Sequence, residues 1–338
     1  MPRSKKWNWR YLLLLSIICL LTATSAFALD LEMSVGSGYD DNPRLEKGSE
    51  GAAFTEAEIN IWWTLPLPNY PSTSITLLSF ANYQLYDGLD DNWQLGAGVV
   101  TSTQLPELPC RLEFFSDIAA YRNPLVDDNE FDNLSLGSRL IWFAGSRLNL
   151  EFEASLSWED YCRTITPENQ RNGGHSLNGS TDKKQPVNQQ NSLNPHNTGQ
   201  PKHHNSGDRS DRLVATALKA FYAFTPYLDG GSEVFWRHRH SSIDAEKRSA
   251  YGLGVNLNWH PTATLEFIWA LSGERLPYKY DYRKEERTEK IYTSEIIASW
   301  RRGSWSISGA WNWSKRDSVI NEDDYRHNLW QGRLTYSY

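Results

Sequence analysis

The chain has few of the features that build helical membrane proteins or disulfide-linked domains. Beyond the N-terminal segment, no apolar run approaches the roughly 20 residues that a spanning helix needs. The mean hydropathy is −0.60. Only three residues are cysteine, and no spacing of Cys and His resembles a zinc site. We therefore expect neither a helical bundle in the membrane nor a structural zinc site.

Basic charge is also scarce. Lys and Arg total 34 residues against 41 Asp and Glu, which gives a formal charge of −7. Residues 1–28 contain four basic and no acidic residues, so the chain without them carries −11. Because binding to a phosphate backbone needs a basic face, nucleic acid is excluded as an expected partner.

The N-terminus has the three parts of a secretory signal. Lys5, Lys6 and Arg10 precede a short apolar run over residues 12–21. Ala26 and Ala28 form a small-x-small cleavage site. The run is too short for a transmembrane anchor. We therefore predict a signal peptide over residues 1–28 and a mature chain over residues 29–338.

Aromatic residues are abundant, with 15 Trp, 17 Tyr and 12 Phe. Many lie in segments where apolar and polar residues alternate, and the segment from Leu148 to Trp158 shows this most clearly. A polar chain with many aromatics and a period of two is typical of a barrel whose strands present every second side chain to lipid. The predicted fold is therefore all-β, a transmembrane up-and-down antiparallel barrel.

The alternation predicts about fourteen strands, an even number as in bacterial single-chain barrels; twelve or sixteen remain open. The expected strands cover residues 31–39, 53–65, 73–86, 93–105, 111–121, 134–143, 148–160, 212–224, 227–240, 249–259, 264–273, 291–300, 305–313 and 326–338.

The connections between these strands alternate in length. Tight turns are expected at residues 66–72, 106–110, 144–147, 225–226, 260–263 and 301–304. Longer polar loops are expected at 40–52, 87–92, 122–133, 161–211, 241–248, 274–290 and 314–325. Short periplasmic turns and long external loops alternate in this way in outer-membrane barrels. Cys110 and Cys162 then lie at opposite ends, so no disulfide between them is expected.

The loop over residues 161–211 has a different composition from the rest. It is rich in Asn, Gln, Ser, Gly, His and Lys and nearly free of aromatics. Such a segment cannot bury enough apolar surface to order itself. We predict a largely disordered external loop; a domain boundary is the alternative.

Tryptophans cluster near strand ends, as in the aromatic girdles at the two membrane interfaces. The candidates are Trp63, Trp93, Trp142, Trp158, Trp236, Trp259, Trp300, Trp305 and Trp313. The alternative is that they are ordinary core aromatics.

The C-terminal residues Leu334, Tyr336 and Tyr338 alternate with polar residues and close on an aromatic. This pattern resembles the terminal strand of Gram-negative outer-membrane barrels, and it does not identify a single family among them. The resemblance implies that the barrel-assembly machinery reads this segment. It also implies outer-membrane localisation, with membrane lipid and lipopolysaccharide as surroundings.

Acidic Asp-Asp-Asn elements recur in the expected loops, at residues 40–42, 90–92 and 127–129, with a looser variant at 321–324. Clustered carboxylates suit Ca²⁺, but none of the elements has EF-hand spacing. Asp and Asn also favour turns because they bond their own backbone. We predict acidic turns, with no metal and no cofactor.

Two stretches contain residue types that catalytic sites use. The stretch 174–179 is superficially similar to the His-x-Ser-Asn-Gly element of outer membrane phospholipase A, but His175 and Ser176 are adjacent and would face opposite ways on a strand. Residues 237–240, with Asp244 beyond them, offer His and Asp for activating water but no second carboxylate. We predict that the protein is not an enzyme.

The polar face of the strands is the strongest functional indication. A charge on the lipid face would cost about 2–4 kcal/mol near the midplane, so charged strand residues should point inward. The candidate pore-lining residues are Glu56, Glu58, Arg111, Glu113, Asp117, Arg139, Glu151, Glu153, Lys219, Glu233, Arg237, Glu266, Glu295 and Arg333. They predict a porin-like channel for small polar solutes or ions. A non-conducting structural or surface-interaction barrel, or a component of a polysaccharide or protein export system, remains open.

Overall fold

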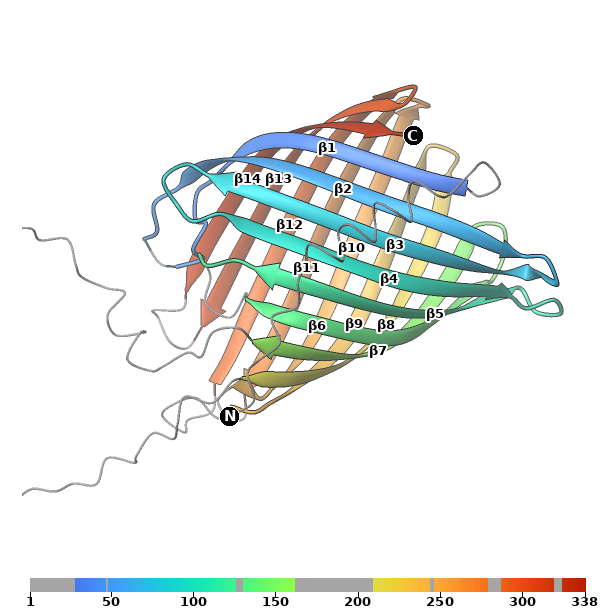
Figure 1. Ribbon diagram of the computed structural model, residues 1–338, viewed down its shortest axis with the longest axis horizontal. Coiled ribbons are helices and arrows are strands. Elements are labelled where there is room, and N and C mark those ends of the chain that lie inside the picture. Colours follow the sequence, from blue (N-terminus) through green and yellow to red (C-terminus); the bar gives the residue numbers. More distant parts are fainter. Residues whose placement is uncertain are drawn as a thin grey trace, which may run out of the picture.

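The computed structural model describes residues 28–338 apart from 47, 126–129, 162–208, 244–245, 279–286 and 319–323. These residues form a closed antiparallel barrel of fourteen strands, the predicted fold class (Figure 1). The strands are β1 (Ala28–Asp40), β2 (Ala52–Leu67), β3 (Tyr70–Tyr86), β4 (Asn92–Gln104), β5 (Cys110–Arg122), β6 (Phe131–Phe143), β7 (Leu148–Tyr161), β8 (Ser210–Thr225), β9 (Leu228–Ser241), β10 (Arg248–Thr262), β11 (Leu265–Tyr278), β12 (Arg287–Arg302), β13 (Trp305–Ser318) and β14 (Tyr325–Ser337).

Each strand pairs with its two neighbours in sequence, and β1 pairs with β14 to close the ring. The closing register runs from Glu32 opposite Ser337 to Asp40 opposite Leu329. Beyond it, the Tyr338 amide donates to the Leu31 carbonyl at 2.8 Å. Closure leaves no strand edge exposed, which a barrel in lipid requires because lipid offers no hydrogen-bond partner.

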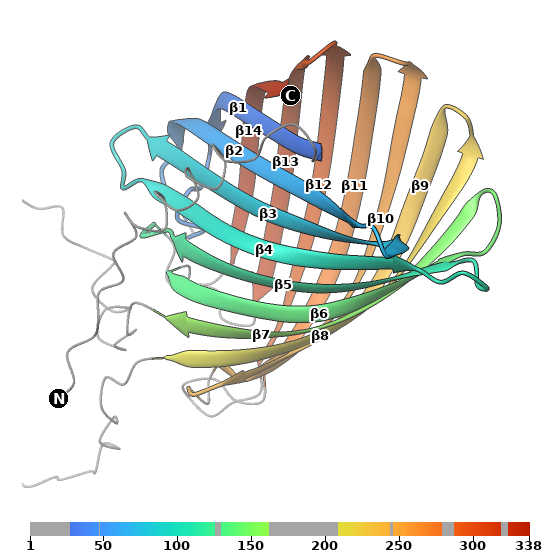
Figure 2. The same cartoon turned by 45° about the vertical axis from the view of Figure 1, so that its right-hand side comes forward.

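Tight turns and longer connections alternate around most of the ring, as the sequence predicts (Figure 2). The exception is the β3–β4 connection, residues 87–91, which is as short as the β4–β5 turn, residues 105–109. The tight turns gather at one end of the barrel, here called the short-turn end, and the other connections lie at the opposite long-loop end. In the β12–β13 turn, Gly303 has a φ of 60°, a conformation that glycine adopts without a steric penalty.

All fourteen predicted strands are present, but several extend further toward the long-loop end than predicted. Alternation predicts 264–273 and 305–313, whereas β11 ends at Tyr278 and β13 at Ser318. The outward residues of these extensions include Arg275 and Lys315 rather than apolar side chains. The alternation of apolar residues therefore ends before the backbone pairing of these strands does.

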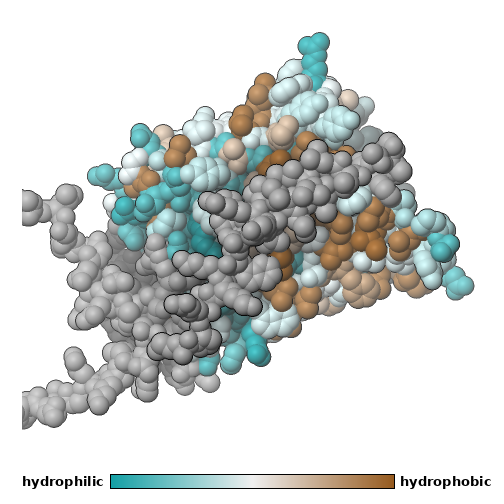
Figure 3. All heavy atoms as spheres, in the orientation of Figure 1, coloured by the Kyte–Doolittle hydropathy of each residue, from teal (hydrophilic) through white to brown (hydrophobic). Residues whose placement is uncertain are grey.

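The outer wall is apolar between the two ends (Figure 3). Its exposed side chains include Val35, Phe114 and Ile307, each more than half accessible. All nine predicted girdle tryptophans lie on this outward face, some toward each end of the barrel. This outer wall and the closed ring make the chain a transmembrane β-barrel of the outer-membrane type. Among the residues described, no helix is long and apolar enough to cross a membrane.

Other predicted features lie partly or wholly outside the described residues. The connection between β7 and β8 is shorter than the predicted loop over residues 161–211, because Tyr161 ends β7 and Ser210 begins β8. Residues 162–208 lie outside the described part of the chain. Cys110 is buried as a free thiol, and its predicted lack of a bond to Cys162 remains a prediction. Ala26 of the predicted cleavage site is also outside. At the C-terminus, the Tyr336 ring packs on Trp305 at a centroid distance of 4.9 Å.

Candidate functional site in the barrel interior

The interior wall carries the charged side chains. Directly opposed residues of antiparallel strands share a face, and the register places one face of every strand inside. All fourteen predicted residues lie on this inner side: Glu56 and Glu58 (β2), Arg111, Glu113 and Asp117 (β5), Arg139 (β6), Glu151 and Glu153 (β7), Lys219 (β8), Glu233 and Arg237 (β9), Glu266 (β11), Glu295 (β12) and Arg333 (β14).

Arg139 is the centre of a paired segment of this wall. Its guanidinium contacts Glu113 at 3.1 Å, Glu151 at 3.2 Å and Glu153 at 2.9 Å. Arg111 contacts Glu113 from the other side at 2.9 Å. Arg139, on β6, therefore bridges the neighbouring strands β5 and β7 and contacts three carboxylates.

Two further interior cations complete the pairing. Lys219 contacts Glu151 at 2.9 Å and Glu153 at 3.4 Å, which extends the network to β8. Across the β1–β14 closure, Arg333 contacts Glu56 at 2.6 Å and Glu58 at 2.9 Å. These pairs neutralise much of the charge on the part of the wall that runs from β14 across the closure to β1 and on to β8.

The wall from β8 to β14 encloses a cavity of about 390 Å³. Its lining is mixed. The polar, uncharged residues are Asn256, Ser272, Thr293, Asn312 and Ser314, and Phe221, Ala270, Lys219 and His327 also line the space. Glu233 and Glu295 add two carboxylates. We call this space the chamber.

Small residues create the chamber. On β10, a Cβ built on Gly254 would have no heavy atom closer than 3.8 Å. Ala270 and Ser272 lie beside it on β11. Phe221 points inward from β8 yet is 40% exposed, which shows that the space beside it admits water.

The two chamber carboxylates differ from those of the paired wall. Among the residues that the structure describes, neither Glu233 nor Glu295 makes an ion pair. Lys219 lies opposite Glu233 in the register, but its contacts are to Glu151 and Glu153. Lys219 also lines the chamber. The chamber therefore holds two carboxylates near one lysine, and that lysine is already paired with the carboxylates of β7.

The interior stays accessible to water toward the short-turn end. There, His260 lies 3.3 Å from Asp229 and 3.6 Å from Glu266. All three side chains are at least 38% exposed.

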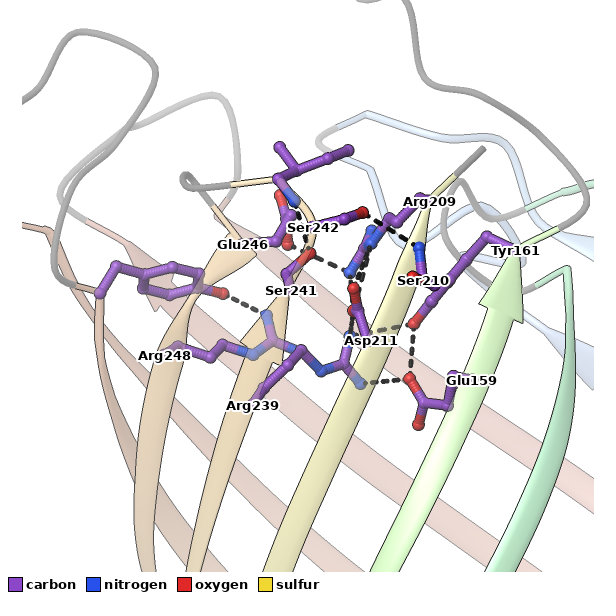
Figure 4. A network of polar contacts seen from close by, with 12 residues as sticks. Glu159, Tyr161, Arg209, Ser210, Asp211, Arg239, Ser241, Ser242, Glu246 and Arg248 are labelled. Carbon is purple, nitrogen blue, oxygen red and sulfur yellow. Dashed lines mark hydrogen bonds and ion pairs between the residues drawn. The ribbon is translucent and has the colours of Figure 1, made fainter. Parts of the chain in front are cut away.

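The long-loop end carries a layer of buried polar side chains that sequence reasoning missed (Figure 4). Arg209 and Asp211 form an ion pair at 2.7 Å, with side chains 1% and 0% exposed. The Arg209 guanidinium also lies 4.1 Å from the centre of the Tyr161 ring. Arg239 contacts Glu159 at 3.1 Å and Asp211 at 3.4 Å.

The layer continues on the other side of the mouth. Asp40 contacts His327 at 2.9 Å and accepts a hydrogen bond from the Tyr86 hydroxyl at 3.1 Å. Glu289 is fully buried and pairs with Arg316 at 2.5 Å.

Apolar side chains join the same layer. Leu125, in the β5–β6 connection, is buried against Phe54 of β2 and Tyr86 of β3. Leu125 therefore lies inside the mouth of the barrel. Alternation along β7 and β8 puts Glu159 and Asp211 on the inner face and so could have indicated the polar side chains of this layer. The predicted loop over residues 161–211 includes Asp211 instead.

The alternative sites considered from sequence do not assemble in the described residues. Arg237 and Arg239 face inward, whereas His238 faces outward and stacks on Trp236 at 6.1 Å. The acidic element at 40–42 forms an Asx turn, in which Asp40 accepts the Asn42 amide. No cluster of three or more His, Cys, Asp or Glu positioned for a metal occurs in the part described. The stretches 127–129, 174–179 and 321–323, and Asp244, lie outside it.

Comparisons with known proteins give structural neighbours only. No family model and no curated protein sequence matches the chain. Solved outer-membrane proteins are similar over nearly the whole chain. A bacterial polysaccharide outer membrane secretin is 9% identical, covering 92% of this chain and 98% of its own, with a TM-score of 0.46. OmpT of Vibrio cholerae is 7% identical, covering 93% and 100%, with a TM-score of 0.47. A FadL homologue of Pseudomonas aeruginosa is 10% identical, covering 92% and 90%, with a TM-score of 0.45.

Proposed function

We propose that the chain is a channel of the Gram-negative outer membrane that lets small polar solutes cross passively and favours cations. The observation that carries the proposal is the chamber. It is a water-accessible space inside a transmembrane barrel. It is lined by hydroxyl and amide groups, by Lys219, and by two carboxylates that lack ion-pair partners among the described residues.

The lining explains the proposed preference. Hydroxyl and amide side chains replace part of a solute's hydration shell without binding it tightly, so the solute can leave again. Carboxylates on a pore wall attract cations and repel anions. The charges of the opposite wall are internally paired and so contribute less field at the chamber than Glu233 and Glu295 do.

Planar-bilayer recording of the refolded mature protein tests the function directly. Steady single-channel conductance with a reversal potential that indicates cation preference would support the proposal. A folded barrel, identified by far-UV circular dichroism, that stays electrically silent in the same bilayers would reject it.

The double variant Glu233→Gln/Glu295→Gln is expected to lose most of the cation preference and keep the conductance at high salt. Both substitutions preserve shape and remove charge from the chamber. The measurement is the reversal potential in a salt gradient. The matched control is Glu107→Gln in the exposed β4–β5 turn, which removes a carboxylate outside the lumen. An unchanged reversal potential in the double variant would place selectivity elsewhere.

A non-conducting interaction barrel is the second candidate. It is favoured by the paired wall around Arg139 and by the position of Leu125 inside the mouth. In that case the barrel would hold its loops for a partner, and the bilayer recording would show a folded, silent protein.

A further inference from the structure

The outer wall carries a basic patch near the long-loop end, formed by Arg275 on β11, Lys290 on β12, Lys315 on β13 and Arg326 on β14. The register sets Arg275 directly opposite Lys290 and Lys315 directly opposite Arg326. Arg275, Lys290 and Arg326 are exposed. Four neighbouring strands therefore present four cations on one side of the barrel.

This arrangement is unfavourable unless something neutralises it, because like charges directly opposite on paired strands repel. Asp317 is the one acidic residue on the outward face of the described parts of these four strands. It contacts Lys315 at 2.7 Å and lies opposite Lys290 in the register. Asp41 adds a second carboxylate at the edge of the patch, where it accepts hydrogen bonds from Asn328 of β14. Four cations against these two carboxylates leave the patch with a net positive charge.

The patch has a defined depth on the membrane-facing wall. Along the outward face of β12 toward the long-loop end, Ile296 is followed by Ser294, then by Tyr292 and then by Lys290. On β13, Trp313 is followed by Lys315. Apolar, aromatic and basic residues thus succeed one another as hydrocarbon, interface and headgroup do in a leaflet. The cations stand at the height of lipid phosphates.

Elsewhere at this end the outward charges are mixed, and the exposed Arg212 at the start of β8 is a single cation. At the same end of β5, the outward Arg122 is neutralised by Asp132 at 2.6 Å. Asp160 on β7 lies opposite Asp132 and adds a further acidic group. A general ring of basic residues would not be interrupted in this way, so the β11–β14 face is a local site.

We propose that this patch binds the phosphates of lipopolysaccharide in the outer leaflet. The four cations lie on adjacent strands and span roughly 14 Å at about 4.8 Å per strand. That width fits a glycolipid headgroup with more than one phosphate better than a phospholipid with one. The inference rests on the proposed placement in the outer membrane, with the long-loop end outside. It does not depend on conduction.

The test is binding of purified bisphosphorylated lipid A to the full-length mature protein in nanodiscs of zwitterionic phospholipid, followed by native mass spectrometry. Arg275→Gln/Lys290→Gln should weaken binding about fivefold for each charge, or roughly 25-fold together. Lipid A without its phosphates should bind the unaltered protein more weakly than the intact lipid binds the variant, because the variant keeps Lys315 and Arg326. The variant's thermal stability without lipid A should be unchanged or slightly higher, because a like-charge pair is gone.

The control is Arg147→Gln/Arg302→Gln, which removes two exposed cations at the short-turn end and should leave lipid A binding unchanged. Equal loss of binding in both double variants would overturn the site. So would equal affinity for dephosphorylated lipid A. Binding of phosphatidylglycerol as tight as that of lipid A would assign the patch to anionic phospholipid and overturn lipopolysaccharide as its ligand. A silent but folded barrel that binds lipid A normally would reject the channel and keep this site.

Discussion

Arg139→Gln is expected to lower the free energy of unfolding of the barrel by about 2 kcal/mol. Removing one partner of a buried ion pair typically costs 3–5 kcal/mol, because the other charge stays uncompensated. Arg139 is 33% exposed, so solvent screens part of this effect. The estimate remains high for one side chain because Glu113, Glu151 and Glu153 all lose the same cation.

Urea unfolding of the refolded barrel in lipid vesicles measures this change. Arg237→Gln is the matched control: it is also an interior arginine, but it is 46% exposed and its ion pair to Glu274 is 3.9 Å long. Its effect should stay within about 0.5 kcal/mol. Equal effects of the two variants would show that the Arg139 network does not hold the wall together.

A second substitution isolates the pairing itself. In a Glu153→Gln background, Arg139→Gln should destabilise the barrel less than it does alone, because one of the stranded carboxylates has been removed. Residues of one ion-pair network are coupled in this way, whereas distant sites add independently. Strict additivity would mean that Arg139 acts through packing of its stem and not through charge.

The barrel could be predicted from the sequence because its determinants are local. Alternation over segments such as Leu148 to Trp158 defines the two faces of a strand, and each connection marks where a strand ends. The cost of charge in lipid then fixes which face is inside. Glu151 and Lys219 could thus be placed on the inner wall although they are far apart in the chain.

Pairing partners and empty space could not be predicted in the same way. That Arg139 contacts three carboxylates depends on the register between β5, β6 and β7, which alternation does not specify. The chamber depends on which small residues become neighbours, as Gly254 and Ser272 do across β10 and β11. The buried layer at the long-loop end was missed because Arg209 and Asp211 follow a polar segment and look like part of it. Their burial arises from contacts with Tyr161 of β7 and Arg239 of β9, the two strands that pair with β8, and alternation does not specify these contacts.

Gly254→Trp is expected to reduce single-channel conductance strongly while the barrel still folds. A Cβ at this position meets only ordinary contacts, the nearest being the Ser272 Cβ at 3.8 Å. The indole must then extend into the 390 Å³ chamber and occupy a large part of it. Heat modifiability on gels checks folding, and bilayer recording measures the conductance.

Two neighbouring positions on β10 serve as controls for this substitution. Leu253→Trp adds similar bulk to the lipid face, where the leucine is 55% exposed, and should leave conductance unchanged. Gly252→Trp should instead force the Phe235 ring to move and destabilise the barrel, because even a Cβ there would lie 2.0 Å from that ring. If Gly254→Trp folds and conducts like the unaltered protein, ions do not pass through the chamber, and the proposed permeation path along the β8–β14 wall is wrong.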